Sequence, residues 1–202
     1  MGKWRMRSGS TRSWSGSSPG WTAGEGAFAG FSLVELMITL AVLAVLITLA
    51  VPSFTSLINS NRLAAQSNEL VAGLQEARIE ALRANRRVTV CRSTDGINCA
   101  AAAATWTRWV TIADSNGNGT IEASDTRLRS GTIKAPLQVT STAQSLTFRA
   151  DGMVRDASGA LVNNTFSVCI PTTQPAQNKR SITLAGGSRV AVTTPAGNGA
   201  CP

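Results

Sequence analysis

Histidine and tyrosine are both absent from this 202-residue chain. Histidine is the commonest general base and metal ligand, so its absence excludes Ser-His and Cys-His nucleophile pairs. Charged residues make up 15% of the chain and hydrophobic residues 43%, which excludes disorder as a description of the whole. The length suits one ordinary globular domain or a small domain with an appendage. These properties argue against an enzyme and predict no catalytic residue, no cofactor and no bound metal.

The cysteines lack the C-x-x-C spacing of zinc and thioredoxin-like sites. The four are Cys91, Cys99, Cys169 and Cys201. This pattern favours two disulfides in an oxidising compartment. Spacing alone leaves open all three pairings of the four residues.

Residues 1–30 have the composition of a flexible basic leader. Thirteen of them are Gly or Ser, and four bases with one acid give the segment a charge of 4 − 1 = +3. Of the chain's net charge of +8, residues 31–202 therefore keep 15 − 10 = +5. This basic excess is compatible with nucleic acid, anionic lipid or acidic protein partners.

Residues 31–51 form a hydrophobic run, in which 17 of 21 residues are apolar. As a helix the run is about 30 Å long, enough to cross one bilayer core. The alternative is a buried helix of a soluble protein. The preceding basic residues predict a cytoplasmic N-terminus, with everything after residue 51 translocated. We expect a transmembrane helix over 31–51.

Glu35 is the one acidic residue in this run, and an acid within a membrane span usually marks a function. The string from Gly30 to Leu36 (G-F-S-L-V-E-L) resembles the processing signal of type IV pilins and type II secretion pseudopilins. The resemblance implies cleavage after Gly30 by a prepilin peptidase and N-methylation of Phe31. It also implies that Glu35 pairs with the Phe31 amine of a neighbouring subunit during assembly. Pro52 stands where many pilin helices have a proline that bends them.

We expect residues 52–87 to continue the helix outside the membrane, in water. Apolar or small residues recur at spacings of four and three, which predicts an amphipathic helix that packs on the head. They are Leu63, Ser67, Leu70, Leu74, Ala77 and Ala81.

Residues 88–202 change to short β-rich runs separated by turn signals such as Asp151-Gly152. Asp-Gly and Asn-Gly pairs are typical of tight hairpins, so we expect an antiparallel sheet. The expected strands are Val88–Arg92, Trp106–Ile112, Thr126–Ile133, Leu137–Thr140, Ser145–Arg149, Thr165–Ile170, Ser181–Leu184 and Arg189–Thr193.

The motifs of this head are similar to those of the GspH/FimT family of minor pseudopilins and minor pilins. They are Val90 to Cys99, Trp106 and Trp109, Asp114 to Gly119, and Leu146 to Gly152. The resemblance implies an α+β, pilin-like fold, with one long N-terminal helix on an antiparallel head. Within it, Cys91 and Cys99 enclose a short turn, and a Cys169–Cys201 bridge would tie the tail to the sheet.

The resemblance implies a minor pseudopilin of type II secretion, at the tip of a short fibre. The alternative is a FimT-like minor type IV pilin that acts in pilus assembly, adhesion or DNA uptake. Its partners would be other pilins or pseudopilins, the prepilin peptidase, the assembly platform and secreted cargo. It would sit in the inner membrane with its head in the periplasm. A signal-anchored binding protein that keeps residues 1–30 is a third possibility.

Two further motifs suggest ligands. Asp114-x-Asn116-x-Asn118-Gly119 with Asp125 resembles an EF-hand loop, but its flanks are strand-like, which favours a polar hairpin loop over calcium.

FimT-like minor pilins implicated in DNA uptake carry a Gly-Arg-x-Arg motif, and the matching stretch here, Gly186 to Arg189, has only the second arginine of that motif. With Lys179 and Arg180, Arg189 is a candidate DNA contact; a solvated basic face is the favoured alternative.

Overall fold

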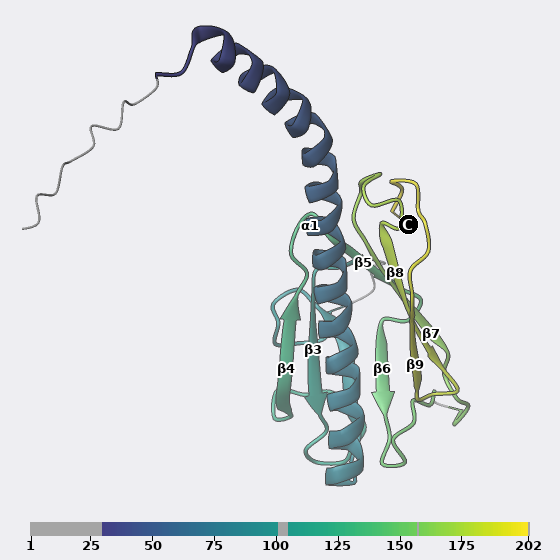
Figure 1. Cartoon of the computed structure of the whole chain (residues 1–202). Helices are drawn as coiled ribbons and strands as arrows, with labels where there is room; N and C mark the ends of the chain where they lie inside the picture. Colours follow the sequence, from purple (N-terminus) through teal and green to yellow (C-terminus); the bar gives the residue numbers. More distant parts are fainter. Residues whose placement is uncertain (1–29, 101–104, 157, 202) are drawn as a thin grey trace, which may run out of the picture. The chain divides into compact units, whose positions relative to one another are not determined.

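The computed structural model describes residues 30–100, 105–156 and 158–201. The expected leader therefore lies outside the described residues, except for Gly30. One helix, α1 (Leu33–Ala84), precedes nine strands in the described part of the chain (Figure 1). The chain divides into two compact units, Met1–Val42 and Leu43–Pro202. α1 begins in the first unit and continues into the second, and the units are described separately.

The start of α1 is capped by Ser32. The Ser32 hydroxyl oxygen accepts a hydrogen bond from the backbone N–H of Glu35 at 3.2 Å. The Ser32 carbonyl accepts the first helical bond, from Leu36 N–H at 3.1 Å. Serine caps a helix well because its short side chain satisfies an N–H that has no partner within the helix. The helix therefore begins at Leu33, two residues after the expected start of the membrane segment.

In the second unit, α1 packs on the strands through the predicted stripe. All six stripe residues, from Leu63 to Ala81, are buried. The helix ends at Ala84, where Asn85 takes a positive φ of 49° and Arg86 N–H bonds to the Ala81 carbonyl at 3.3 Å. That geometry is a Schellman cap, which asparagine supports better than most residues. The expectation of a helix to residue 87 was three residues too long.

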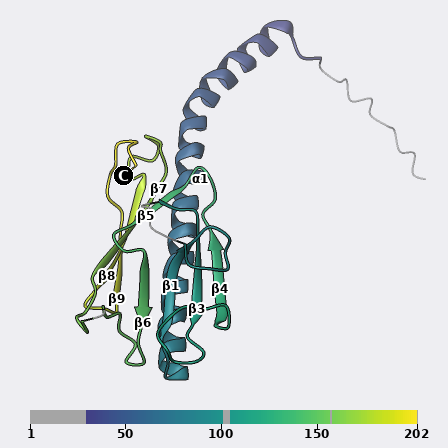
Figure 2. The same cartoon turned by 180° about the vertical axis from the view of Figure 1, so that it is seen from behind.

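The strands form two antiparallel sheets, where we had expected one. The first sheet has the order β4-β3-β1-β6 and the second β2-β5-β7-β8-β9. Figures 1 and 2 show the second-unit part of α1 with β3 and β4 to one side and β8 and β9 to the other. The strands are β1 (Val88–Ser93), β2 (Thr105–Trp106), β3 (Arg108–Ala113), β4 (Thr126–Thr132), β5 (Gln138–Ser141), β6 (Ser145–Phe148), β7 (Asn164–Cys169), β8 (Lys179–Ala185) and β9 (Arg189–Thr193).

The expected strand Trp106–Ile112 is in fact two strands that belong to different sheets. β2 pairs with β5 in the second sheet, and β3 pairs with β1 and β4 in the first. The break falls at Thr107, whose carbonyl accepts a bond from Ile133 N–H at 2.9 Å. One β-rich run thus crosses from one sheet to the other, which is why a single sheet was the wrong expectation.

Two buried tryptophans on either side of this break fill the core. Trp106 meets Phe166 of β7 edge to face, with ring centroids 5.1 Å apart. Trp109 lies against Gly73 of α1 and Gly131 of β4, and a side chain at either glycine would collide with its indole. The two glycines therefore make the space in which helix and first sheet meet.

Two disulfides join the strands to irregular segments. Cys91 of β1 pairs with Cys99, and Cys169 at the end of β7 pairs with Cys201 near the C-terminus. Buried Asn178 supports the second bridge, since its Nδ2 donates to the Ile170 carbonyl at 2.9 Å. The structure thus selects one of the three pairings that the sequence left open.

Candidate assembly site

The N-terminal motif forms the beginning of α1 in the first unit. Phe31 is 79% exposed and precedes the helix, and Glu35 lies in the first helical turn. An acidic group is favourable there because the helix dipole places partial positive charge at that end. Gly30 and Phe31, the expected cleavage pair, lie just outside the helix in an irregular segment. The peptide bond between them is therefore not held in helical hydrogen bonding.

The helix presents apolar side chains on its surface through the predicted membrane segment. Among the described residues, α1 is the one helix long and apolar enough to cross a membrane, with a mean hydropathy of 2.6 over its best 18-residue window. None of that window is buried in the chain. Water is an unfavourable solvent for such a surface, so lipid or other apolar helices must cover it.

Pro52 lies inside α1, which continues without a break on both sides of it. Proline removes one backbone donor from the helix and commonly bends it; the bend stays a prediction. Beyond Pro52, Phe54, Leu57 and Ile58 remain exposed. The apolar helix surface thus extends past the residue at which the membrane segment was expected to end.

A polar clamp joins α1 to the second sheet just after these residues. Asn59 Nδ2 donates to the Gln174 carbonyl at 2.9 Å, and Arg180 Nη2 donates to Ser60 Oγ at 3.2 Å. A shallow groove of about 420 Å³ lies next to the clamp, between Pro52, Ser53 and Ser56 of the helix and residues 173–176. The clamp fixes the head at this point of the helix.

The three candidate DNA contacts do not form one cluster. Lys179 and Arg180 begin β8, whereas Arg189 begins β9 and pairs with Ala185 at the other end of β8. Lys179 and Ala185 are six residue steps apart along the strand, a length of about 20 Å. Arg180 also donates to the Gln177 carbonyl at 2.9 Å, in addition to Ser60. The Arg180 side chain therefore helps to join α1 to β8.

The EF-hand-like loop joins β3 to β4, so strands flank it as the sequence indicated. Asp114 accepts backbone N–H bonds from Gly117 and Gly119, at 2.7 and 2.8 Å. Asp125 accepts them from Ser115 and Glu122, both at 2.9 Å, and these bonds lower the pKa of Asp125. The two carboxylates hold the loop closed through its own backbone.

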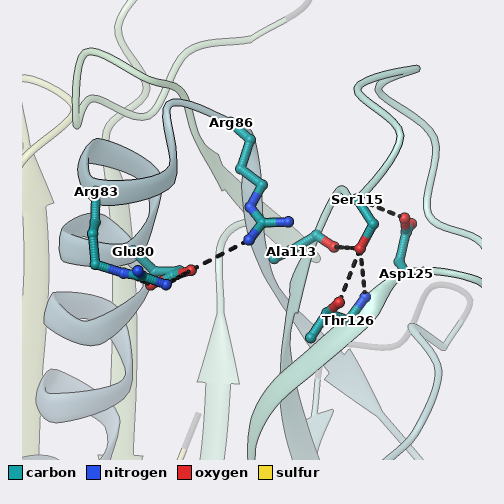
Figure 3. A network of polar contacts seen from close by, with 7 residues as sticks. All are labelled: Glu80, Arg83, Arg86, Ala113, Ser115, Asp125 and Thr126. Atoms are coloured by element: carbon teal, nitrogen blue, oxygen red, sulfur yellow. Dashed lines mark hydrogen bonds and ion pairs between the residues drawn. The ribbon is translucent and has the colours of Figure 1, made fainter.

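A charged cluster lies where α1 ends, close to this loop (Figure 3). Glu80 accepts two bonds from Arg83, at 2.7 and 2.8 Å, and these hold the pKa of Glu80 below its ordinary value. Arg86 approaches the same carboxylate less closely, at 3.6 Å. Sequence reasoning did not single out Arg86, Arg87 or Arg149. The two adjacent arginines at the end of the predicted helix were the available signal.

Comparison with known proteins agrees with the architecture. The family model described as type II transport protein GspH matches residues 66–188, more than half of the chain. The model described as the prokaryotic N-terminal methylation motif matches residues 27–51. No curated protein matches the chain.

Solved structures similar to this chain include two minor subunits. One is the type IV minor pilin FimU of Pseudomonas aeruginosa, 22% identical, covering 66% of this chain and 90% of FimU, with a TM-score of 0.49. The other is the minor pseudopilin EpsH from the type 2 secretion system of Vibrio cholerae, 13% identical, covering 66% of this chain and 97% of EpsH, with a TM-score of 0.47.

The methylation motif, the apolar N-terminal helix and the antiparallel head are the parts of a membrane-anchored, pilin-type protein. Proteins of this type assemble with other pilins in a pilus or pseudopilus. The match over residues 66–188 identifies the head. The chain therefore belongs to the GspH family of minor pseudopilins and minor pilins.

Proposed function

We propose that this chain is a minor pseudopilin of a type II secretion system, with a structural and non-catalytic role. The observation that carries the proposal is the match of the head to type II transport protein GspH, together with the methylation motif on residues 27–51. In this role the protein joins other pseudopilins at the tip of a short periplasmic fibre. The fibre acts on secreted cargo by mechanical movement.

Before processing, the protein lies in the inner membrane in this proposal, with residues 1–30 in the cytoplasm and the head in the periplasm. The basic leader favours this orientation, and the two disulfides suit an oxidising compartment. A prepilin peptidase cuts between Gly30 and Phe31, and Phe31 is methylated on its new amine. The helix then leaves the bilayer with the assembly platform's help.

Glu35 guides the subunit into the fibre in this proposal. A carboxylate among apolar side chains is costly unless it meets an opposite charge. The amine of Phe31 on a neighbouring subunit supplies that charge, so correct docking neutralises both groups. The exposed apolar side chains of α1 then pack against neighbouring helices and leave contact with lipid.

The N-terminus of the mature protein tests the proposal directly. We expect mass spectrometry of protein from the native host to find N-methylated Phe31 and no residue from 1–30. A Gly30→Leu variant should keep the leader, because it changes the residue after which cleavage is proposed, while its head folds normally. Wild-type protein that retains residues 1–30 would support a signal-anchored binding protein instead.

A deletion strain separates the two fibre systems. Loss of exoprotein secretion with normal twitching and transformation is the outcome expected for type II secretion. Normal secretion with loss of twitching or transformation would favour the minor type IV pilin.

DNA binding is the specific function tied to the pilin alternative, through Lys179, Arg180 and Arg189. Their positions at opposite ends of β8 weigh against one phosphate-binding surface. A gel-shift assay at low salt with wild-type protein and Arg189→Ala tests it. Binding that the substitution weakens would favour this function, and no binding by the wild type would end it.

A further inference from the structure

A basic pocket lies beyond the end of α1, at the opposite end of the helix–sheet unit from Pro52. It has a volume of about 300 Å³ and is lined by Asn85, Arg86, Arg87, Gly117, Arg149 and Ala150. From Pro52 to Ala84 the helix rises about 48 Å. The pocket is therefore on the part of the head farthest along the helix from the membrane segment.

Three of the six lining residues are arginines, and none is acidic. The Arg87 backbone carbonyl accepts the Asp114 N–H at 3.0 Å, but its exposed side chain makes no hydrogen bond or ion pair with any residue that the structure describes. Arg86 has a buried Nε without a hydrogen-bond partner there, and its ion pair with Glu80 is long, at 3.6 Å. The Glu80 carboxylate already accepts hydrogen bonds from Nε and Nη2 of Arg83. The pocket thus has positive charge that its own chain does not neutralise.

The acidic residues around the pocket are engaged elsewhere. Asp114 accepts the N–H groups of Gly117 and Gly119. Asp151 pairs with Arg155 at 2.9 Å, which is the main reason that the pKa of Asp151 is lowered, and attraction to Arg149 of the pocket is the smallest of the causes. Arg149 donates to a neutral acceptor, the Asp156 carbonyl, at 2.8 Å. An anion from outside the chain is therefore the available counter-charge.

The fold holds the arginines in place. Arg87 lies against Gly119, where a side chain would collide with its guanidinium. The turn that carries Gly119 is fixed by Asp114, and Arg149 begins a second turn closed by the Gly152 N–H at 2.8 Å. Both turns lie in loops of the first sheet, and these hydrogen bonds fix the segment that faces Arg87 and the segment that carries Arg149.

An apolar surface adjoins the pocket. Ile79 and Leu82, one helical turn apart, are 61% and 49% exposed. Leu82 reaches the turn after Arg149, because a Cβ at Gly152 would lie 3.0 Å from it. Arginine is enriched at protein interfaces, and the exposed aliphatic side chains beside it favour a partner with apolar groups over a phosphate backbone.

We propose that Arg86, Arg87 and Arg149, with Ile79 and Leu82, bind an acidic and aliphatic segment of a neighbouring subunit in the fibre. Its carboxylates enter the arginine pocket, where guanidinium groups bind them through two parallel hydrogen bonds. Its aliphatic side chains cover Ile79 and Leu82. The identity of the partner as a fibre subunit rests on the proposed function; the binding chemistry does not.

A titration of the full chain in detergent micelles tests the chemistry without any fibre. The probes are a peptide of alternating glutamate and leucine, inorganic phosphate and a short DNA duplex, at low salt. We expect the peptide to bind and the variant Arg86→Gln/Arg87→Gln/Arg149→Gln to bind it at least tenfold more weakly. The matched control Arg62→Gln/Lys134→Gln/Arg189→Gln removes the same charge and should change the affinity less than twofold.

Two further variants keep the test decisive if the triple variant folds poorly. Arg87→Gln removes a guanidinium group that has no hydrogen-bond or ion-pair partner among the described residues. The variant should therefore fold normally and still bind the peptide several-fold more weakly. Ile79→Ser should weaken binding of the glutamate–leucine peptide but not of hexaglutamate. Equal losses in the triple variant and its control would overturn the proposal. So would phosphate or DNA binding through the pocket in place of the peptide.

In the native host, Arg87→Glu separates this proposal from the proposed function. We expect a processed, folded protein that no longer supports fibre assembly. A normal fibre with Arg87→Glu would overturn the pocket's role and leave the proposed function standing. Absence of cleavage after Gly30 in the wild type would instead count against the proposed function, whatever the peptide titration shows.

Discussion

The indole of Trp109 lies so close to Gly73 of α1 that a Cβ at position 73 would come within 2.5 Å of the ring. The tryptophan is fully buried on β3, and its strand partner on β4 is the second glycine, Gly131. The Trp109 ring therefore fills the space between Gly73 of α1 and Gly131 of β4, where the helix and the first sheet meet.

Gly73→Ala should destabilise the head. Overpacking costs about 1–3 kcal/mol, and the better helix propensity of alanine offsets up to about 1 kcal/mol of it. We expect a net loss of up to about 2 kcal/mol in urea unfolding followed by tryptophan fluorescence. The reverse exchange at the exposed neighbour, Ala72→Gly, measures the propensity part alone. The contact would be refuted by a Gly73→Ala protein more stable than wild type.

Acid should destabilise the loop after β1. The pKa of Asp95 lies well below its ordinary value of 3.8, because its carboxylate accepts backbone N–H bonds from Asn98 and Ile97 and further bonds from the Asn98 and Ser93 side chains. A lowered pKa in the folded state means that this stabilisation is present above about pH 4 and is lost as the pH falls below it. Asp95→Asn should therefore reduce the slope of Tm against pH below pH 4, and an unchanged slope would contradict the assignment.

The two disulfides should differ in their contribution to stability. The Cys169–Cys201 bridge spans 32 residues and Cys91–Cys99 spans 8. Loop-closure entropy predicts about 3.7 kcal/mol for the longer loop and about 2.5 kcal/mol for the shorter. Paired Cys→Ser variants, compared by urea unfolding, should show the larger loss for Cys169 and Cys201. If the Cys91 and Cys99 variant lost more stability, contacts made by that bridge in the folded state would outweigh the difference in loop-closure entropy of the unfolded chain.

Glu35→Gln should block assembly without affecting processing. The substitution removes the charge and keeps the shape, so cleavage after Gly30 and methylation of Phe31 should proceed while fibre incorporation falls at least tenfold. Shearing of cells and immunoblotting of the released fibres measures incorporation. Arg62→Gln, which removes a charge from the exposed part of the same helix, is the control. Normal incorporation of Glu35→Gln would remove this residue from the assembly mechanism.

Local patterns in the sequence predicted the elements well. The spacing of Leu70 and Leu74 predicted the buried face of α1, and the pair Asp151-Gly152 predicted a turn in which Gly152 has a positive φ. Each of these signals lies within a few residues of the feature it specifies. Physical preferences of short segments are therefore enough to place most strands and the helix.

Relationships between distant residues were not predictable in this way. Nothing in the run from Thr105 to Ala113 marks the change of sheet at Thr107, because both halves are equally β-prone. The bond from Arg180 to Ser60 joins residues 120 positions apart, and the pocket around Arg87 forms only when two loops meet the end of α1. Such features depend on how the elements pack.

The contacts between α1 and the two sheets are spread along the axis of the helix. Asn59 and Ser60 bond to the second sheet's side, the buried stripe follows, and Glu76 pairs with Arg129 of β4 at 2.9 Å. A pull directed along α1 loads these contacts in parallel, as shear, rather than one after another, as in peeling. Resistance to forced unfolding depends on the rate of the unfolding step. Because shear must break many contacts together, the head can carry tension along the helix and remain attached.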